Sequence, residues 1–124
     1  MSWLRADYAI SKQFLLASVM AMLQDLLLPM FEDDYYPDSL VTEIKQHILC
    51  FAQKLKADLS DAEIYHFAQQ TTSAMNKMKS KFSDLDSSLD DSATDYIAEA
   101  MMMVLQAAGY LEFDIEELVA NREW

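Results

Sequence analysis

Residues able to do chemistry are sparse in this chain, and the two histidines are the natural place to look for a site. Glu63 and His66 are three positions apart, a spacing that puts both side chains on one face of a helix. Paired copies of Glu-x-x-His build di-iron centres inside four-helix bundles. The sequence holds no second copy. A metal-binding helical bundle with carboxylate and histidine ligands is therefore the least favoured of the three functions that the sequence suggests.

The other histidine, His47, precedes the chain's one cysteine, Cys50, by three residues. This pair supplies two ligands, whereas a structural zinc site takes four. Cys50 also falls within an apolar run at helical spacing, where a thiol is usually buried and inert. With one glycine, the sequence has neither a glycine-rich phosphate loop nor a nucleophile elbow. We therefore expect a protein that is not an enzyme and that carries no metal and no cofactor.

The acid-rich segment at residues 83–94, SDLDSSLDDSAT, partly matches a calcium-binding loop. With Asp84 as position one, acids or serines fall at positions three, five, seven and nine. Position six is Leu89, where the sharp turn needs glycine, and position twelve is Asp95, where a bidentate glutamate is needed. The two departures favour a solvated linker over a calcium site.

Composition predicts that helices position all of these residues. A chain of 124 residues, 52% of them hydrophobic, can fill one core, so we expect a single domain over residues 1–124. One glycine and two prolines are too few for the tight turns of a sheet protein. The predicted fold class is all-α, a single-domain helical bundle of four main helices plus a short C-terminal helix.

Apolar periodicity places five helices, at about residues 4–28, 37–57, 61–82, 91–108 and 114–120. Pro29 is expected to end the first helix, and Pro37 or Asp38 to begin the second. Ser60 stands three residues before Glu63, the spacing of a capping box.

The apolar run at residues 14–30 superficially resembles a secretory signal. Gln24 and Asp25 interrupt it, and it falls short of the roughly 18 to 20 apolar residues that a spanning helix needs. We expect a buried helix rather than a signal or an anchor, because no small-residue cleavage site closes the run. The lone cysteine and nine methionines suit a reduced interior, so a cytoplasmic location is expected.

Negative charge is concentrated in the later part of the chain. Residues 1–81 hold ten acids and eight bases, whereas residues 82–121 hold ten acids and no base. Such a surface attracts a basic protein over about 8 to 10 Å at physiological salt, and repels nucleic acid and anionic membranes. We expect a basic protein partner and no direct contact with nucleic acid or membrane. The predicted contact residues in this region are Asp84, Asp86, Asp90, Asp91, Asp95 and Glu99.

A second candidate contact region is FEDDYYPDSL, Phe31 to Leu40, with four acids, two tyrosines and a proline. One interpretation is a helix corner, since Pro, Asp and Ser favour turns and helix starts without any ligand. The other is a binding loop, in which tyrosines anchor a charged rim. The sequence leaves both open. A binding loop would use Glu32, Asp33, Asp34, Tyr35 and Tyr36.

Three segments carry a family resemblance: EDDYYPDSLV (32–41), DYIAEA (95–100) and EELVANREW (116–124). They resemble a family of small acidic bacterial proteins, the domain-of-unknown-function family 5713. The DDYYP element before a helix is the most specific of the matches, and the resemblance covers about residues 28–124. It departs at MMMV (101–104) and at the centre of the third helix. The resemblance implies a compact helical domain and offers no catalytic residues.

Size, helicity, uneven acidity and the lack of catalytic groups favour a protein that binds another protein. The predicted function is an immunity or antitoxin-like inhibitor that neutralises a basic toxin through an acidic surface. The alternative is an inhibitor that mimics nucleic acid and blocks a DNA- or RNA-binding or defence enzyme. Regularly spaced carboxylates would favour mimicry, and a compact patch with aromatic anchors favours the toxin partner. The apolar first helix also offers a surface for a homodimer.

Overall fold

The computed structural model describes residues 18–124, so the predicted start of the first helix lies outside the described residues. Residues 18–26 are helical and lead into the short α2 (Leu28–Glu32). The rest of the chain forms α3 (Asp38–Lys54), α4 (Asp61–Asn76), α5 (Lys79–Asp84), α6 (Asp91–Ala107) and α7 (Ile115–Leu118). The predicted all-α helical bundle is confirmed.

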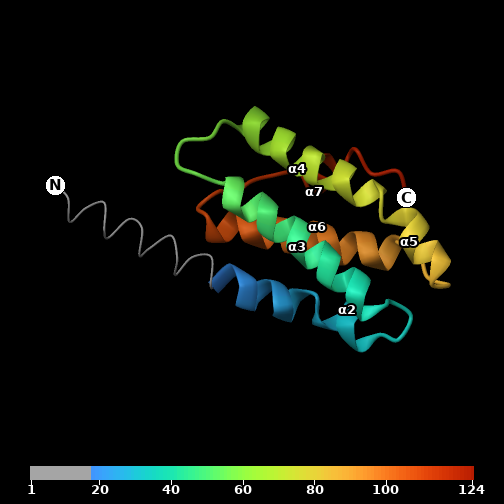
Figure 1. Cartoon of the computed structure of the whole chain (residues 1–124). Coiled ribbons are helices and arrows are strands. Elements are labelled where there is room, and N and C mark those ends of the chain that lie inside the picture. The colour runs from blue at the N-terminus through green and yellow to red at the C-terminus, as the bar shows by residue number, and fades with distance from the viewer. Residues whose placement is uncertain (1–17) are drawn as a thin grey trace.

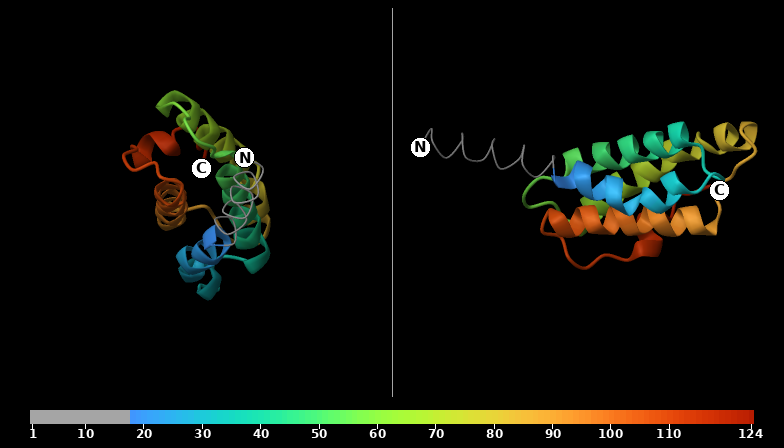
Figure 2. Two further views of the ribbon diagram at one scale, coloured as in Figure 1. Left: turned by 90° about the vertical axis from the view of Figure 1, so that its left-hand side faces the viewer. Right: turned by 90° about the horizontal axis from the view of Figure 1, so that it is seen from below.

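The long helices run back and forth along one axis (Figure 1). α3 packs against both α4 and α6, and α7 contacts α4 and α6 together. The α2–α3 connection, α5 and the start of α6 gather at one end of the bundle, as both Figure 1 and the right panel of Figure 2 show. The α3–α4 connection lies at the other end, where the Tyr110 hydroxyl donates a hydrogen bond to the Lys56 carbonyl.

One hydrophobic core fills the space between the helices. It takes side chains from every element, because the apolar stripes predicted from sequence all face inward. Among its fully buried members are Leu23, Ile44, Phe51, Ile64, Phe82, Ile97, Met101 and Leu118.

Two helix ends form by the local rules that the sequence suggested. The Ser60 hydroxyl accepts from Glu63 N–H at 3.1 Å and the Glu63 carboxylate accepts from Ser60 N–H at 3.2 Å, which confirms the capping box. At the end of α6, Gly109 adopts a φ of 94°. Tyr110 N–H then reaches the Leu105 carbonyl at 2.9 Å, as in a Schellman motif.

The helices differ from the prediction in two places. The first helix ends before Pro29, as predicted, but the short helix α2 follows at once and was not predicted; Pro29 occupies its first turn, where the missing N–H removes no helical hydrogen bond. The predicted helix over residues 61–82 is two helices. Met78 N–H donates to the Met75 carbonyl at 2.8 Å, a tightened turn that closes α4 before α5 begins.

Cys50 is exposed, although the sequence pattern suggested a buried thiol. The buried positions of α3 are Leu40, Val41, Ile44, Ile48 and Phe51. A residue two positions after Ile48 turns by about 200° at 100° per residue, so the Cys50 side chain points away from the core. No helix in the described part of the chain is both long and apolar enough to cross a membrane.

Candidate functional site

Two acidic segments that are far apart in the sequence meet at one end of the bundle. The connection from α2 to α3 lies against the connection from α5 to α6, and side-chain hydrogen bonds join them. The hydroxyls of Tyr35 and Ser88 are 2.8 Å apart. The Tyr36 hydroxyl donates to Asp90 Oδ1 at 2.5 Å. The acidic end, as we call this surface, consists of the exposed acids Glu32, Asp33, Asp34, Asp84, Asp86 and Asp91.

Tyr36 and Asp90 hold this end together and do not form part of its exposed surface. The Tyr36 side chain is 3% exposed, and burial, followed by the hydrogen bond and the charge of Asp90, raises its pKa well above the ordinary value. Asp90 Oδ1 also accepts from Ala93 N–H at 2.9 Å and so caps α6. The prediction that Tyr36 contacts a partner is therefore corrected, since its side chain is buried. Asp90 is half-buried, and its Oδ1 is used within the fold.

Apolar groups stand among the exposed acids. The side chain of Tyr35 is 45% exposed and that of Leu85 is 54% exposed. Tyr35 is held by the contact with Ser88 and by an edge-to-face packing on Tyr36, with ring centroids 5.2 Å apart. Leu85 was not expected as a contact, because in the sequence it is one apolar residue inside a polar linker. Its exposure follows from its place at the C-terminal end of α5.

Asp95 and Glu99 continue the acidic surface along α6. With Asp91 they occupy successive turns of the helix, and all three side chains are exposed. Within residues 18–124, none of these three acids forms an ion pair with a lysine. Lys81 pairs with Glu43 at 2.9 Å, and Lys79 Nζ donates to the Glu123 carbonyl at 3.3 Å.

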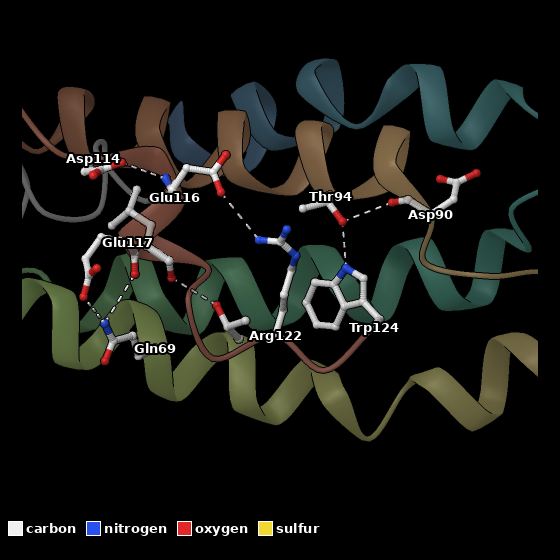
Figure 3. Close-up of polar contacts among 10 residues, drawn as sticks. Gln69, Asp90, Thr94, Asp114, Glu116, Glu117, Arg122 and Trp124 are labelled. Atoms are coloured by element: carbon white, nitrogen blue, oxygen red, sulfur yellow. Dashed lines mark hydrogen bonds and ion pairs between the residues drawn. The ribbon is translucent and has the colours of Figure 1, made fainter.

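The C-terminal segment, residues 115–124, is fastened along α4 and α6 (Figure 3). Gln69 Nε2 donates to Glu117 Oε1 at 3.0 Å. The Asn76 side chain forms two hydrogen bonds with the backbone of the segment: its Nδ2 donates to the Asn121 carbonyl at 2.9 Å, and its Oδ1 accepts from Glu123 N–H at 2.8 Å. Trp124 Nε1 donates to Thr94 Oγ1 at 2.7 Å. The sequence left open whether Trp124 docks. The polar residues of α4, which recur at spacings of three and four, could have indicated a surface on which the C-terminal segment docks.

Hydrogen bonding continues from Trp124 into the acidic end. Thr94 Oγ1, which accepts from Trp124, donates to the Asp90 carbonyl at 3.0 Å, as Figure 3 shows. Arg122 lies 3.8 Å from Glu116, an ion pair that keeps the last basic residue close to the acids of α7. The C-terminal segment thus supports the start of α6, which carries the acids Asp90 and Asp91.

The residues considered for metal binding are not gathered into a site. Glu63 is engaged by Ser60, and His66 is exposed. Within residues 18–124 no group of three or more His, Cys, Asp or Glu side chains is placed to hold an ion. His47 and Cys50 line an open groove of about 440 Å³ beside Glu43, Lys77 and Lys81. Burial lowers the pKa of His47, and the Lys81 charge acts in the same direction, against the charge of Glu43.

The fold and this surface define a small all-α bundle with an acidic end built from two connections. Comparison with protein families places residues 20–124 in a family described as "Family of unknown function (DUF5713)", and the chain belongs to this family. The resemblance noted from the DDYYP element is thereby confirmed. No curated protein and no solved structure matches the chain.

Proposed function

We propose that this protein is a non-catalytic inhibitor of the immunity or antitoxin type, which neutralises a basic toxin in the cytoplasm. The observation that carries the proposal is the meeting of two acidic connections at one end of the bundle, joined by the Tyr36–Asp90 and Tyr35–Ser88 hydrogen bonds. Six exposed acids stand on this end. Their combined field favours a basic protein surface and increases its rate of encounter.

Tyr35 and Leu85 supply what the acids alone lack. Charged rims mainly set the association rate, whereas partly exposed aromatic and aliphatic groups that become buried in a complex slow its dissociation. Both side chains are about half exposed and lie beside acids of their own connection. The internal hydrogen bonds hold Tyr35 and its neighbours in place before binding, so little conformational entropy is lost in the complex.

This arrangement favours a dedicated protein partner over nucleic-acid mimicry. A mimic would present carboxylates in a long regular series that matches the spacing of phosphates. Here the regular series on α6 is the three residues Asp91, Asp95 and Glu99, whereas the other acids cluster around Tyr35 and Leu85. A compact patch with apolar anchors is the usual anatomy of a specific interface.

The first test uses a variant that removes three charges from the acidic end. Asp84→Asn, Asp86→Asn and Asp91→Asn are combined, and Asp90 is kept because it caps α6. Asp86 has a φ of 57°, a conformation that asparagine tolerates well. Tagged wild-type and variant chains are used to capture proteins from the native source, and association with the captured protein is then timed. We expect the association rate at low salt to fall by about tenfold, with a smaller effect at high salt.

The matched control carries the same charge change at the opposite end of the bundle. Asp58→Asn, Asp61→Asn and Glu112→Gln alter exposed acids near the α3–α4 connection and after α6. This control variant should associate like the wild type. Equal loss of association in both variants would mean that only net charge matters. Unchanged association of the first variant at low salt would overturn the acidic end as the docking surface.

A further inference from the structure

A second hollow lies beside the acidic end, between α5, the α5–α6 connection and the C-terminal segment. It has a volume of about 290 Å³. This is close to the lower limit of about 300 Å³ for small-molecule sites in proteins, so it suits a ligand of about one ring. The residues that line it are Lys79, Ser83, Ser87, Ser88, Leu89 and Trp124.

Ser87 is the lining residue whose buried side chain has no hydrogen-bond partner among the described residues. Its side chain is 7% exposed, and its Oγ has no hydrogen-bond partner among residues 18–124. A buried hydroxyl without a partner costs about 1 to 3 kcal/mol, so such groups usually pair with a protein group, a water or a ligand. The N–H of Ser87 already has a partner, since it donates to the Phe82 carbonyl at 2.9 Å. The unpaired group is therefore the hydroxyl itself.

The chemistry around Ser87 indicates which ligand would pair with it. Lys79 is the charged side chain of the lining, and it spends one donor on the Glu123 carbonyl, which leaves two N–H groups for a ligand. Ser83 and Ser88 add two further hydroxyls. An ammonium with several hydroxyls in one hollow is a set of donors that matches the oxygens of a carboxylate or a phosphate.

The remaining walls of the hollow are apolar. Leu89 is 6% exposed, and the Trp124 indole is fixed by its bond to Thr94. A rigid indole beside a leucine favours a flat apolar body on the ligand, because aromatic groups stack and bury area at little entropic cost. The acids of the acidic end oppose an anion, but none of them lines the hollow, whereas Lys79 does.

We infer that this hollow is a binding site for a small organic anion, with a carboxylate or phosphate group held by Lys79 and Ser87 and a flat apolar body against Trp124. This proposal does not rest on the protein partner proposed above. The hollow and the acidic end are adjacent, because Ser88 lines the hollow and also contacts Tyr35.

The test uses Trp124 as the reporter. The chain has two tryptophans, so Trp3→Phe leaves Trp124 as the single emitter. Phenyl phosphate and benzoate are the probes, and benzyl alcohol is the neutral counterpart. We expect the two anions to change Trp124 fluorescence saturably with a Kd of about 1 mM or lower, as suits ligands of this size. Benzyl alcohol should bind at least about tenfold more weakly, which is the effect of losing one charge-assisted hydrogen bond.

Two variants test the named groups. Ser87→Ala and Lys79→Gln should each weaken binding of the anions by about tenfold or more. Ser87→Ala should leave the melting temperature unchanged or raise it, because the lost hydroxyl has no partner within the fold. Lys77→Gln, the same charge change on an exposed side chain outside the lining, should bind like the parent chain.

Three results would overturn the site. They are no saturable response to either anion, equal binding of benzyl alcohol, and unchanged binding by the Ser87→Ala chain. Equal binding of benzyl alcohol would leave an apolar hollow that does not recognise charge, and unchanged binding by the Ser87→Ala chain would remove the Ser87 hydroxyl from the site. The stability measurement separates these outcomes from misfolding, since a folded Ser87→Ala chain that still binds contradicts the assignment directly.

Discussion

At the corner between α2 and α3, the Tyr36 hydroxyl is the long-range donor to Asp90. Replacing it by Tyr36→Phe leaves a half-buried carboxylate with fewer donors. We expect the free energy of unfolding to fall by about 1 to 2 kcal/mol, as measured by urea denaturation. The matched control is Tyr35→Phe, because that hydroxyl meets Ser88 at an exposed site and should change stability by less than about 0.5 kcal/mol. Equal effects of the two substitutions would contradict the structural role of Tyr36.

The same residue predicts how stability depends on alkaline pH. The pKa of Tyr36 is raised in the folded chain, mainly by burial, above the value of about 10 in an unfolded chain. A raised folded pKa means that the stabilisation is complete below about pH 10 and declines as pH rises toward the folded value. The stability difference between wild type and Tyr36→Phe should therefore narrow above about pH 10. A difference that stays constant through this range would count against burial of the neutral phenol.

At this corner the sequence indicated a helix start, but it did not indicate which tyrosine would be buried. The DDYYP element combined the features of a helix start and of a binding loop, and it proves to contain both a buried corner residue, Tyr36, and an exposed one, Tyr35. Which tyrosine turns inward depends on Ser88 and Asp90, more than fifty residues away. Local propensity carries no information on such a contact. The unpaired hydroxyl of Ser87 was unpredictable for the same reason.

At the scale of elements, Asn76 is the α4 side chain that bonds to the backbone of the C-terminal segment at two residues. Asn76→Ala removes both of its bonds to the backbone of residues 121 and 123. We expect this segment to exchange its amide hydrogens faster, and the Trp124 emission to shift to the red as the indole meets water. Hydrogen exchange and fluorescence in the Trp3→Phe chain measure this. Gln70→Ala, an exposed position on the same helix, is the control. Unaltered exchange at residues 121–124 would show that the other contacts of the segment, among them Trp124 to Thr94, hold it without Asn76.

The elements themselves were largely predictable where local side chains end them. Ser60, Glu63 and Gly109 act within a few residues of the boundary that they define, so the capping box and the end of α6 could be read from sequence. The break between α4 and α5 has no glycine or proline to announce it. It accompanies the full burial of Met78 and Phe82, which is a matter of tertiary packing.

For the whole molecule, the net charge of −12 predicts a response of stability to salt. Like charges at the acidic end repel one another in the folded chain, and added salt screens them. We expect the melting temperature to rise by about 2 to 4 °C between low salt and physiological salt or above. The chain with Asp84→Asn, Asp86→Asn and Asp91→Asn should gain less, and the control with Asp58→Asn, Asp61→Asn and Glu112→Gln should respond like the wild type. The same gain in all three chains would contradict a local origin.

The distribution of charge along the sequence anticipated an acidic surface, and it did so correctly for the α5–α6 connection. It did not reveal that residues 32–34 would join this surface, because net charge is nearly balanced over residues 1–81. The chain leaves this end along α3 and returns along α4 and α5, which brings the two groups of acids to one end, as Figure 2 shows. The candidate surface therefore depends on how the folded chain places its acids in space, and the distribution of charge along the sequence does not show this.

The pairs Tyr35–Ser88 and Tyr36–Asp90 span 53 and 54 residues, so the acidic end exists only in a chain that has closed its tertiary structure. Contacts of this sequence separation form slowly, since a long loop must close first. A protein that recognises both connections would bind the native state and not the unfolded chain. Recognition and folding would then be thermodynamically linked, and an excess of the partner would protect the folded chain from unfolding by mass action.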